Sequence, residues 1–200
     1  MNLEVLKENI DKIDIYILDQ ILKERYQPGD ILLDAGCGKG RNLKWFYNYD
    51  IEIVGIDTES EALNTCKELY PKQKDNFIQA SVDKLPFEAN SFNHIICNAV
   101  LHFAKNELHF FSMLNELIRV LKPNGSLFIR IASNFGIEND VEYLEKGNYK
   151  LPDGSTRFLL TQDLLNTITL MKEIQIVEAV KTTIVHGKRC MTTLVIEKVS

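Results

Sequence analysis

The chain has 200 residues, of which 45% are hydrophobic and 26% charged, and its formal net charge is −5. This length and ordinary globular composition predict a single domain over 1–200 with a well-buried core. Lysines and arginines are scattered along the sequence, so we expect no nucleic-acid partner. The first residues carry acids and no uninterrupted apolar run, which predicts neither a signal peptide nor a membrane span.

The spacing of cysteines and histidines argues against secreted and metal-binding classes. The four cysteines, at 37, 66, 97 and 190, form no C-x-x-C pair, so reduced thiols in a cytoplasmic protein are the simpler interpretation. The four histidines, at 94, 102, 109 and 186, lack the H-E-x-x-H spacing, and no metal site is expected. We expect a monomer or a homodimer.

Helical and extended patterns alternate along the chain. Apolar residues at three- and four-residue steps predict a helix over 1–26, and we interpret 1–27 as an N-terminal helical cap. Antiparallel strands are predicted at the end, over 174–185 and 190–199. The pattern predicts an α/β fold whose mostly parallel, doubly wound sheet ends in an antiparallel hairpin, with helices on both faces. The other predicted elements are strands at 31–33, 51–56, 77–80, 94–98 and 126–131, and helices at 42–49, 60–70 and 107–121.

Residues 133–158 fit no regular element, and three glycines and a proline interrupt them. So long an irregular stretch in a compact domain is more often a binding segment or lid than an idle loop. We therefore interpret 133–158 as a substrate lid.

A glycine-rich turn follows the first predicted strand, in the sequence Leu-Leu-Asp-Ala-Gly-Cys-Gly-Lys-Gly over 32–40. Without side chains, its backbone amides can approach a ligand closely, and the helix N-terminus that follows favours negative charge. Asp34 adds a fixed anion that would attract an ammonium group. A ligand that carries both charges, such as a methionine moiety, suits both features.

The spacing of this turn can be weighed against two other cofactors. A dinucleotide fingerprint G-x-G-x-x-G needs a third glycine where this chain has Arg41, and a P-loop needs a Gly-Lys-Ser/Thr ending that is absent. Asp57 closes the next predicted strand, 21 residues beyond Gly36, where a carboxylate can accept hydrogen bonds from both ribose hydroxyls. The alternative for Asp57 is a helix cap before 58–60. The carboxylate therefore indicates a ligand that contains adenosine, but it does not distinguish among the cofactors that contain it.

Four patches between 30 and 131 resemble one family in the right order. They are 33–40, Gly-Ile-Asp at 55–57, Leu-Pro-Phe at 85–87 with Ser-Phe-Asn at 91–93, and Arg-Val-Leu-Lys-Pro-Asn-Gly at 119–125. They resemble the class I S-adenosylmethionine-dependent methyltransferases, of the bacterial small-molecule type. The resemblance implies a Rossmann-like fold with a seven-stranded sheet and S-adenosyl-L-methionine as cofactor.

The resemblance also implies positions for the cofactor. The glycine turn would line its methionine end, and the end of the second strand would hold its ribose. A later loop would contact its adenine, and Asn98 would lie beside the reacting sulfur. Ser81 stands where the family often has Asp. The implied cofactor-binding residues are Asp34, Gly36, Cys37, Gly38, Gly40, Asp57, Thr58, Ser81, Val82 and Asn98.

Methyl transfer needs mainly alignment, because proximity and orientation can supply about 7–11 kcal/mol of a barrier without an acid or base. His102 is the candidate catalytic base, and helix-start packing is its alternative. Arg130 lies within a predicted strand and needs either an internal carboxylate or an anionic substrate. The substrate-side candidates are Tyr16, Arg130, Tyr149 and Arg157.

The family resemblance implies an enzyme that transfers the methyl group of S-adenosylmethionine to a small-molecule acceptor. The alternative is a non-catalytic S-adenosylmethionine-binding regulatory or partner protein. An NAD-dependent oxidoreductase is disfavoured by Arg41.

Overall fold

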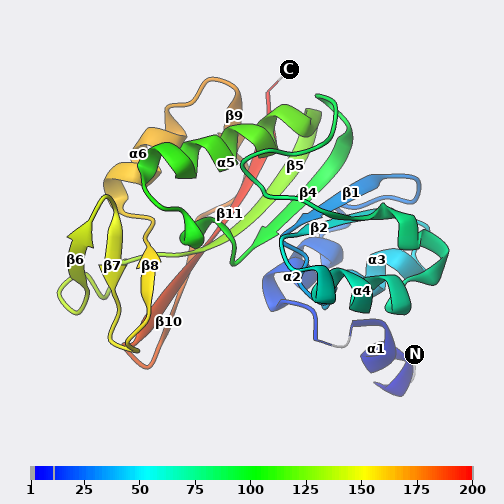
Figure 1. Ribbon diagram of the computed structural model, residues 1–200, viewed down its shortest axis with the longest axis horizontal. Helices are drawn as coiled ribbons and strands as arrows, with labels where there is room; N and C mark the ends of the chain where they lie inside the picture. The colour runs from blue at the N-terminus through cyan, green and yellow to red at the C-terminus, as the bar shows by residue number, and fades with distance from the viewer. Residues whose placement is uncertain (1–2, 11, 200) are drawn as a thin grey trace.

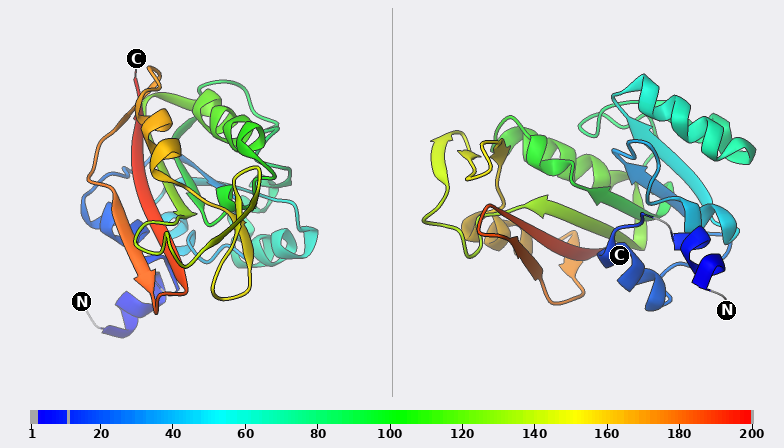
Figure 2. Two further views of the ribbon diagram at one scale, coloured as in Figure 1. Left: turned by 90° about the vertical axis from the view of Figure 1, so that its left-hand side faces the viewer. Right: turned by 90° about the horizontal axis from the view of Figure 1, so that it is seen from below.

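The protein, described here by a computed structural model over residues 3–10 and 12–199, is built around one twisted sheet (Figure 1). Positions 1, 2, 11 and 200, which belong to the predicted N-terminal helix, cap and single domain, lie outside the described residues. Helices cover both faces of the sheet (Figure 2).

Five strands pair in parallel in the spatial order β3-β2-β1-β4-β5, so the order reverses between β1 and β4. In open α/β sheets ligands bind at such a reversal, outside the carboxyl ends of the strands. The parallel strands are β1 (Ile31–Ala35), β2 (Glu52–Asp57), β3 (Phe77–Gln79), β4 (Phe92–Asn98) and β5 (Leu121–Ala132).

Beyond β5 the sheet becomes antiparallel. β11 (Arg189–Lys198) pairs with β5, and both β10 (Lys181–Val185) and the short β9 (Ile174–Ile176) pair with β11. The predicted mostly parallel sheet with an antiparallel end is confirmed. The strand predicted over 174–185 is divided in two, which gives eight strands in the described sheet instead of seven. Glu178 lies between the two strands and pairs its carboxylate with Lys23 and Arg25.

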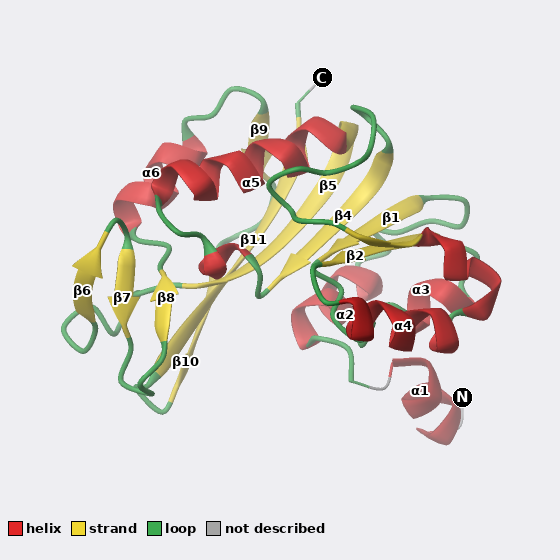
Figure 3. Cartoon of the chain, in the orientation of Figure 1, coloured by secondary structure: helices red, strands yellow, loops and turns green. Residues whose placement is uncertain are grey.

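Side-chain alternation along the strands produces a separate core on each face. Leu32 packs with α2 (Ile15–Leu22), α3 (Lys44–Asn48) and α4 (Ser60–Leu69), and 3₁₀ helix η1 (Pro71–Asn76) follows α4. Leu33, one residue on, packs with α5 (Glu107–Val120) and α6 (Gln162–Thr169) on the opposite face. Figure 3 shows these helices on their two sides of the sheet. Because successive strand residues point to opposite faces, both cores are fixed by one sheet.

The N-terminal region is two helices, so the prediction of one helix over 1–26 is wrong. α1 (Leu3–Ile10) ends before Asp14, which caps α2 with an extended backbone and accepts a hydrogen bond from the amide of Tyr16 at 3.0 Å. The amide of Asp14 donates to the side chain of Asn42 at 3.1 Å. The apolar spacing continues through this point, but the capping side chain starts a new helix.

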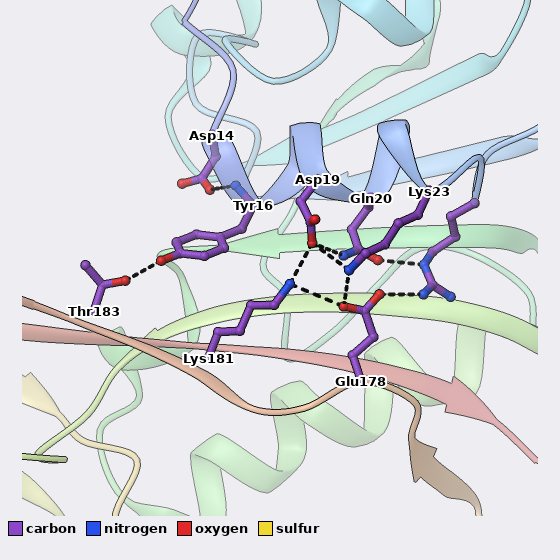
Figure 4. Close-up of polar contacts among 9 residues, drawn as sticks. Asp14, Tyr16, Asp19, Gln20, Lys23, Glu178, Lys181 and Thr183 are labelled. Atoms are coloured by element: carbon purple, nitrogen blue, oxygen red, sulfur yellow. Dashed lines mark hydrogen bonds and ion pairs between the residues drawn. The ribbon is translucent and has the colours of Figure 1, made fainter.

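Ion pairs tie α2 to the connection between β9 and β10 (Figure 4). Lys181 and Lys23 both donate to Asp19, at 2.6 and 2.8 Å, and these bonds lower the pKa of Asp19. Glu178 accepts from Lys23 at 2.6 Å and from Arg25 at 2.9 Å. These ion pairs therefore connect α2 to the antiparallel end of the sheet.

The segment 133–158 is not wholly irregular, which corrects that prediction. It contains β6 (Glu142–Glu145), β7 (Asn148–Lys150) and β8 (Thr156–Phe158), which form a small antiparallel sheet at one end of the molecule (Figure 1). These strands are short and β6 is exposed, so they lack the apolar alternation from which strands are predicted. α6, also unpredicted, begins at Thr161, whose side chain accepts from the amide of Leu164.

Candidate functional site

A cavity of about 460 Å³ lies at the carboxyl ends of β1 to β4, where the strand order reverses. We call it the first cavity. Its volume is within the usual range for ligand pockets. Of the residues assigned to the cofactor from the sequence, those that line it are Gly36, Gly38, Asp57, Thr58, Ser81, Val82 and Asn98.

The glycine turn is shaped by three positive φ angles, at Gly36, Gly38 and Gly40. Gly36 has φ +85°, and a Cβ there would lie 2.3 Å from Cγ2 of Val100, so a side chain is excluded. Gly38 has φ +52° and no atom within 4 Å of an added Cβ. The amides of Gly36 and Cys37 both donate to Ile56 O at 2.9 Å. These two amides therefore hold the turn against β2. Because Gly36 and Gly38 have no side chains, the turn leaves the cavity open.

Asp57 joins the ends of β1 and β2. Its Oδ2 accepts from the amide of Gly38 at 2.8 Å, and its Oδ1 accepts from the amide of Glu59 at 3.0 Å. The second bond forms a local turn before α4, whose N-cap is Glu59 and not Asp57, the helix cap that was the alternative. A carboxylate has about four lone-pair sites, so Asp57 can also accept hydrogen bonds from hydroxyl groups in the cavity.

Cys37 and Gly40 lie behind the turn and do not line the cavity. A hydrogen bond with Cys66, together with burial, raises the pKa of the Cys37 thiol far above its ordinary value. Gly40 has φ +75° and packs against Tyr70, whose hydroxyl donates to Gly40 O at 2.7 Å. Both residues hold the loop in place.

Two buried polar side chains near the first cavity have unpartnered atoms among the described residues. Asp34 is 1% exposed, its Oδ2 has no hydrogen-bond partner, and burial raises the pKa of this carboxyl to about 7. Both amide atoms of Asn98 are also unpartnered. Asp34 lies in β1 beside β4, and Asn98 ends β4. Unpaired buried polar groups are costly, so the site fits a ligand that brings a cation and hydrogen-bonding groups.

Several lining residues escaped the sequence analysis. His109, on the first turn of α5, makes a 3.3 Å contact from Nε2 to Oδ2 of Asp83, and Asp83 also binds the hydroxyl of Ser81. Helical spacing gives such a residue no functional signal. The segment after β4 could have been suspected, since it follows a strand end at the switch point. The lining residues missed are Glu59, Ala80, Ala99, Val100, Phe103, His109 and Met113.

A second cavity of about 360 Å³ lies next to the first, and Ala99 lines both. Ala99 has φ +63°, an unusual conformation for a residue with a side chain. Among the substrate-side candidates, Tyr16 and Tyr149 do not line this second cavity. Its lining residues are Ala99, His102, Arg130, Ala132, Leu151, Asp153, Ser155, Arg157, Val185, Arg189, Cys190 and Met191.

His102, on 3₁₀ helix η2 (Leu101–Phe103), is 7% exposed. Burial, followed by the charge of Arg157, lowers its pKa to about 4, so the ring is neutral near pH 7. Nδ1 accepts from the amide of Ala132 at 3.4 Å, which places the proton of the neutral ring on Nε2. The lowered pKa makes the ring a weak base, and in this tautomer His102 can donate a hydrogen bond through Nε2.

Arg130 has the internal carboxylate that was one of its two alternatives. Its Nη1 donates to Oδ2 of Asp14 at 2.8 Å, and its guanidinium carbon lies 5.3 Å from the ring centre of Tyr16. The hydroxyl of Tyr16 in turn bonds to Thr183 (Figure 4). The Nε atom of Arg130 is buried without a partner among the described residues. The N-terminal cap thus reaches the second cavity through Arg130.

Arg157 and Tyr149 lie on neighbouring strands of the small sheet. The guanidinium carbon of Arg157 lies 5.0 Å from the ring centre of Phe103, and its Nη1 donates to Thr156 O. Tyr149 packs on Tyr143, with ring centres 5.2 Å apart. Arg157 therefore faces the second cavity, whereas Tyr149 belongs to the packing of the small sheet.

Two further findings concern the described part of the chain. It contains no group of three or more His, Cys, Asp or Glu side chains that could hold a metal ion. No helix within residues 3–10 and 12–199 is long and apolar enough to traverse a bilayer.

Comparisons with known proteins agree with this geometry. A family model described as a methyltransferase domain matches residues 33–129. An uncharacterized protein of Methanocaldococcus jannaschii is 31% identical over 132 residues, which is 66% of this chain and 48% of that protein. A tRNA (carboxymethyluridine(34)-5-O)-methyltransferase of Xenopus tropicalis is 28% identical over 144 residues, 72% of this chain and 21% of that protein. The chain thus spans about half or less of the length of these relatives.

Among solved structures, a Burkholderia thailandensis 1,6-didemethyltoxoflavin-N1-methyltransferase superposes with a TM-score of 0.69. It has 18% sequence identity, and the match covers 92% of this chain and 76% of that one. Its structure contains bound 1,6-didemethyltoxoflavin and S-adenosylhomocysteine. The family model identifies residues 33–129 as a methyltransferase domain, and the fold of the chain agrees with that of this methyltransferase.

Proposed function

We propose that the first cavity holds S-adenosylmethionine and that the second holds a small-molecule methyl acceptor. The observation that carries this proposal is that the two cavities share Ala99 as a wall. Methyl transfer requires donor and acceptor to meet in line, and two ligand-sized spaces on either side of one residue provide that meeting point.

The residues of the first cavity fit the cofactor. Asp57 offers free lone pairs to the ribose hydroxyls, and the turn at Gly36 and Gly38 admits the methionine end. The unpartnered carboxylate oxygen of Asp34 and the amide of Asn98 supply the polar partners that this end needs. When bound, S-adenosylmethionine supplies an activated methyl group and leaves as S-adenosylhomocysteine.

The residues around the second cavity position the acceptor. His102 donates a hydrogen bond from Nε2, which orients an acceptor atom without removing its proton. Leu151, in the connection between β7 and β8, and Val185, at the end of β10, add apolar lining to the space. Alignment of this kind can supply about 7–11 kcal/mol of the barrier without a general base.

A small acceptor suits the size of the second cavity, about 360 Å³. The Burkholderia protein acts, by its title, on a small heterocycle. A tRNA acceptor is the second candidate, because the Xenopus relative is named for it and because a groove elsewhere on the molecule is basic. The basic residues of that groove are Lys12, Lys39, Arg41 and Lys44.

One set of assays tests these alternatives. Calorimetry should show tight binding of S-adenosylhomocysteine and none of NAD. Protein with cofactor labelled in its methyl group is then incubated with a cell metabolite extract below 1 kDa or with bulk tRNA. Label in a small product supports the proposal, and label in tRNA alone overturns it. Cofactor binding without any transfer would indicate the non-catalytic regulatory or partner protein instead.

A further inference from the structure

The second cavity is cationic, although the chain as a whole carries a net charge of −5. Its charged lining consists of Arg130, Arg157 and Arg189 against one carboxylate, Asp153. The pKa of His102 is lowered to about 4, so this ring adds no charge near pH 7. A positive concave surface in an acidic protein concentrates anions.

The three arginines differ in how far their charges are already paired. Arg130 binds Asp14 at 2.8 Å, and Arg189 lies 3.4 Å from Asp153. Arg157 has no carboxylate within 4.0 Å among the described residues. Within the part of the chain that the structure describes, its one hydrogen bond is donated to the carbonyl of Thr156. Its guanidinium keeps most of its five donors for a ligand.

Arg157 also occupies the boundary between the two cavities. Its guanidinium stacks over Phe103, a residue that lines the first cavity, while Arg157 itself lines the second. Arg130 lines the same space, and its Nε is buried without a hydrogen-bond partner among the described residues. An anionic group here would meet an unpaired cation and an unused buried donor.

The surface next to this cavity is basic as well. An adjoining depression shares Asp153, Val185 and Arg189 with the second cavity and adds His186 and Lys188. Cationic side chains at an entrance raise the local concentration of an anionic substrate and its rate of association.

We propose that the methyl acceptor is an anionic small molecule, bearing a carboxylate or phosphate, and that Arg157 binds this group with help from Nε of Arg130. This inference rests on the proposed function, because it takes the second cavity as the acceptor site. Arg157 is then a specificity-determining residue, since a guanidinium matches the planar or tetrahedral oxygens of such groups.

The test fractionates the metabolite extract on an anion-exchange resin at pH 7, and each fraction is assayed with labelled cofactor. The retained fraction should support methyl transfer at least about tenfold faster than the unretained one. Arg157→Gln should slow transfer at limiting amounts of the retained fraction by about 10- to 100-fold, because a hydrogen bond to a charged group is worth about 1.5–3 kcal/mol. Larger amounts of that fraction should restore the rate.

Two variants serve as controls. Arg157→Lys keeps the charge and should retain intermediate activity, and it provides the same test if Arg157→Gln fails to fold. Lys146→Gln removes an exposed cation of the β6–β7 turn outside the cavity and should behave as wild type. All variants should bind S-adenosylhomocysteine within about twofold of wild type.

Transfer supported by the unretained fraction would overturn the inference. Equal rates for Arg157→Gln and Lys146→Gln on the retained fraction would overturn it too. If no fraction is methylated although S-adenosylhomocysteine binds, the proposed function itself fails, and the inference falls with it. Anion selectivity and methyl transfer are thus judged by different readouts.

Discussion

The two cavities of this protein are built in different ways. The first is formed largely by residues at the ends of adjacent parallel strands, whose positions follow from the backbone of the sheet. The second collects residues from η2, β5, the small sheet β6–β8 and the β10–β11 hairpin. Its walls thus come from segments far apart in sequence.

This difference teaches where variation can occur. A change in the small sheet or in the terminal hairpin alters the second cavity and leaves the strand ends of the first intact. A chain of this kind can therefore hold one cofactor in a fixed way while its acceptor changes. Mutations that alter the properties of one cavity should leave the other unchanged, and the following measurements test this independence.

The largest effect is expected from Asp57→Ala, on the first cavity alone. The change removes the carboxylate that accepts hydrogen bonds from the amides of Gly38 and Glu59. The same carboxylate is the proposed acceptor for the ribose hydroxyls. We expect the Kd for S-adenosylhomocysteine to rise more than about 100-fold, since each charged hydrogen bond is worth about 1.5–3 kcal/mol. Calorimetry measures it, with Glu61→Gln, on the exposed surface of α4, as control. Unchanged affinity would remove Asp57 from the cofactor site.

The next effect concerns the second cavity. Asp14→Asn keeps the helix cap of α2 but leaves Arg130 without its carboxylate. We expect a loss of about 2 kcal/mol in the free energy of unfolding, less than the 3–5 for a fully buried pair. The reason is that the Arg130 side chain stays 20% exposed, against 4% for Asp14.

Denaturant unfolding measures this loss, and the affinity for S-adenosylhomocysteine should stay within about twofold. Asp19→Asn, on the same helix but in half-exposed ion pairs, is the matched control and should lose less than about 1 kcal/mol. Cofactor affinity that falls together with stability in Asp14→Asn would show that the two cavities are not independent.

The strand-end residues were predictable because their signals are local. A strand, a glycine turn and a helix follow one another in sequence, and the ends of parallel strands meet at one edge of the sheet. Gly36 and Asp57 could thus be assigned to one site before any distance was known, and the family resemblance added Asn98. Cys37 and Gly40 share the same pattern, yet their packing behind the turn depends on Cys66 and Tyr70, which the pattern does not specify.

The second cavity was only partly predictable, because its contacts join distant residues. Arg130 and Asp14 are 116 positions apart, and sequence could offer only the choice between an internal and an external partner. The short strands of β6–β8 lack periodicity, so the connection between β7 and β8, with Asp153 and Ser155, carried no signal. His102 was found from its place after β4, but its tautomer depends on the amide of Ala132.

The affinity of the first cavity for S-adenosylhomocysteine should depend on pH, with a change of about tenfold. The pKa of Asp34 is raised to about 7 by burial, with the charge of Arg41 acting in the opposite direction. If the ionised carboxylate binds the ammonium of the cofactor, affinity for S-adenosylhomocysteine should fall about tenfold from pH 8 to pH 6, as the carboxylate gains its proton. Calorimetry at both pH values measures the change. Asp34→Asn should flatten it.

The same carboxyl affects stability with a defined sign. Its folded pKa lies above the unfolded value of 3.8, so the folded state binds the proton more tightly. Asp34 therefore destabilises the ligand-free protein above about pH 7, and this cost disappears as the pH falls toward 4. Equal pH dependence of unfolding in wild type and in Asp34→Asn would contradict the buried, unpaired state of this group.

The smallest effect is expected from Ser81→Ala, at the edge of the first cavity where the resemblance predicts the adenine. Ser81 is exposed, and its hydroxyl already donates to Asp83, which lowers the pKa of that carboxyl. Asp83 remains beside the cavity after the change, so the Kd for S-adenosylhomocysteine should change less than about threefold. The inosine analogue, which lacks the adenine amino group, should bind with the same relative affinity in both proteins. A tenfold loss confined to the adenine ligand would instead make the hydroxyl of Ser81 the group that recognises the amino group, and would place adenine recognition back on the position at which the family often has Asp.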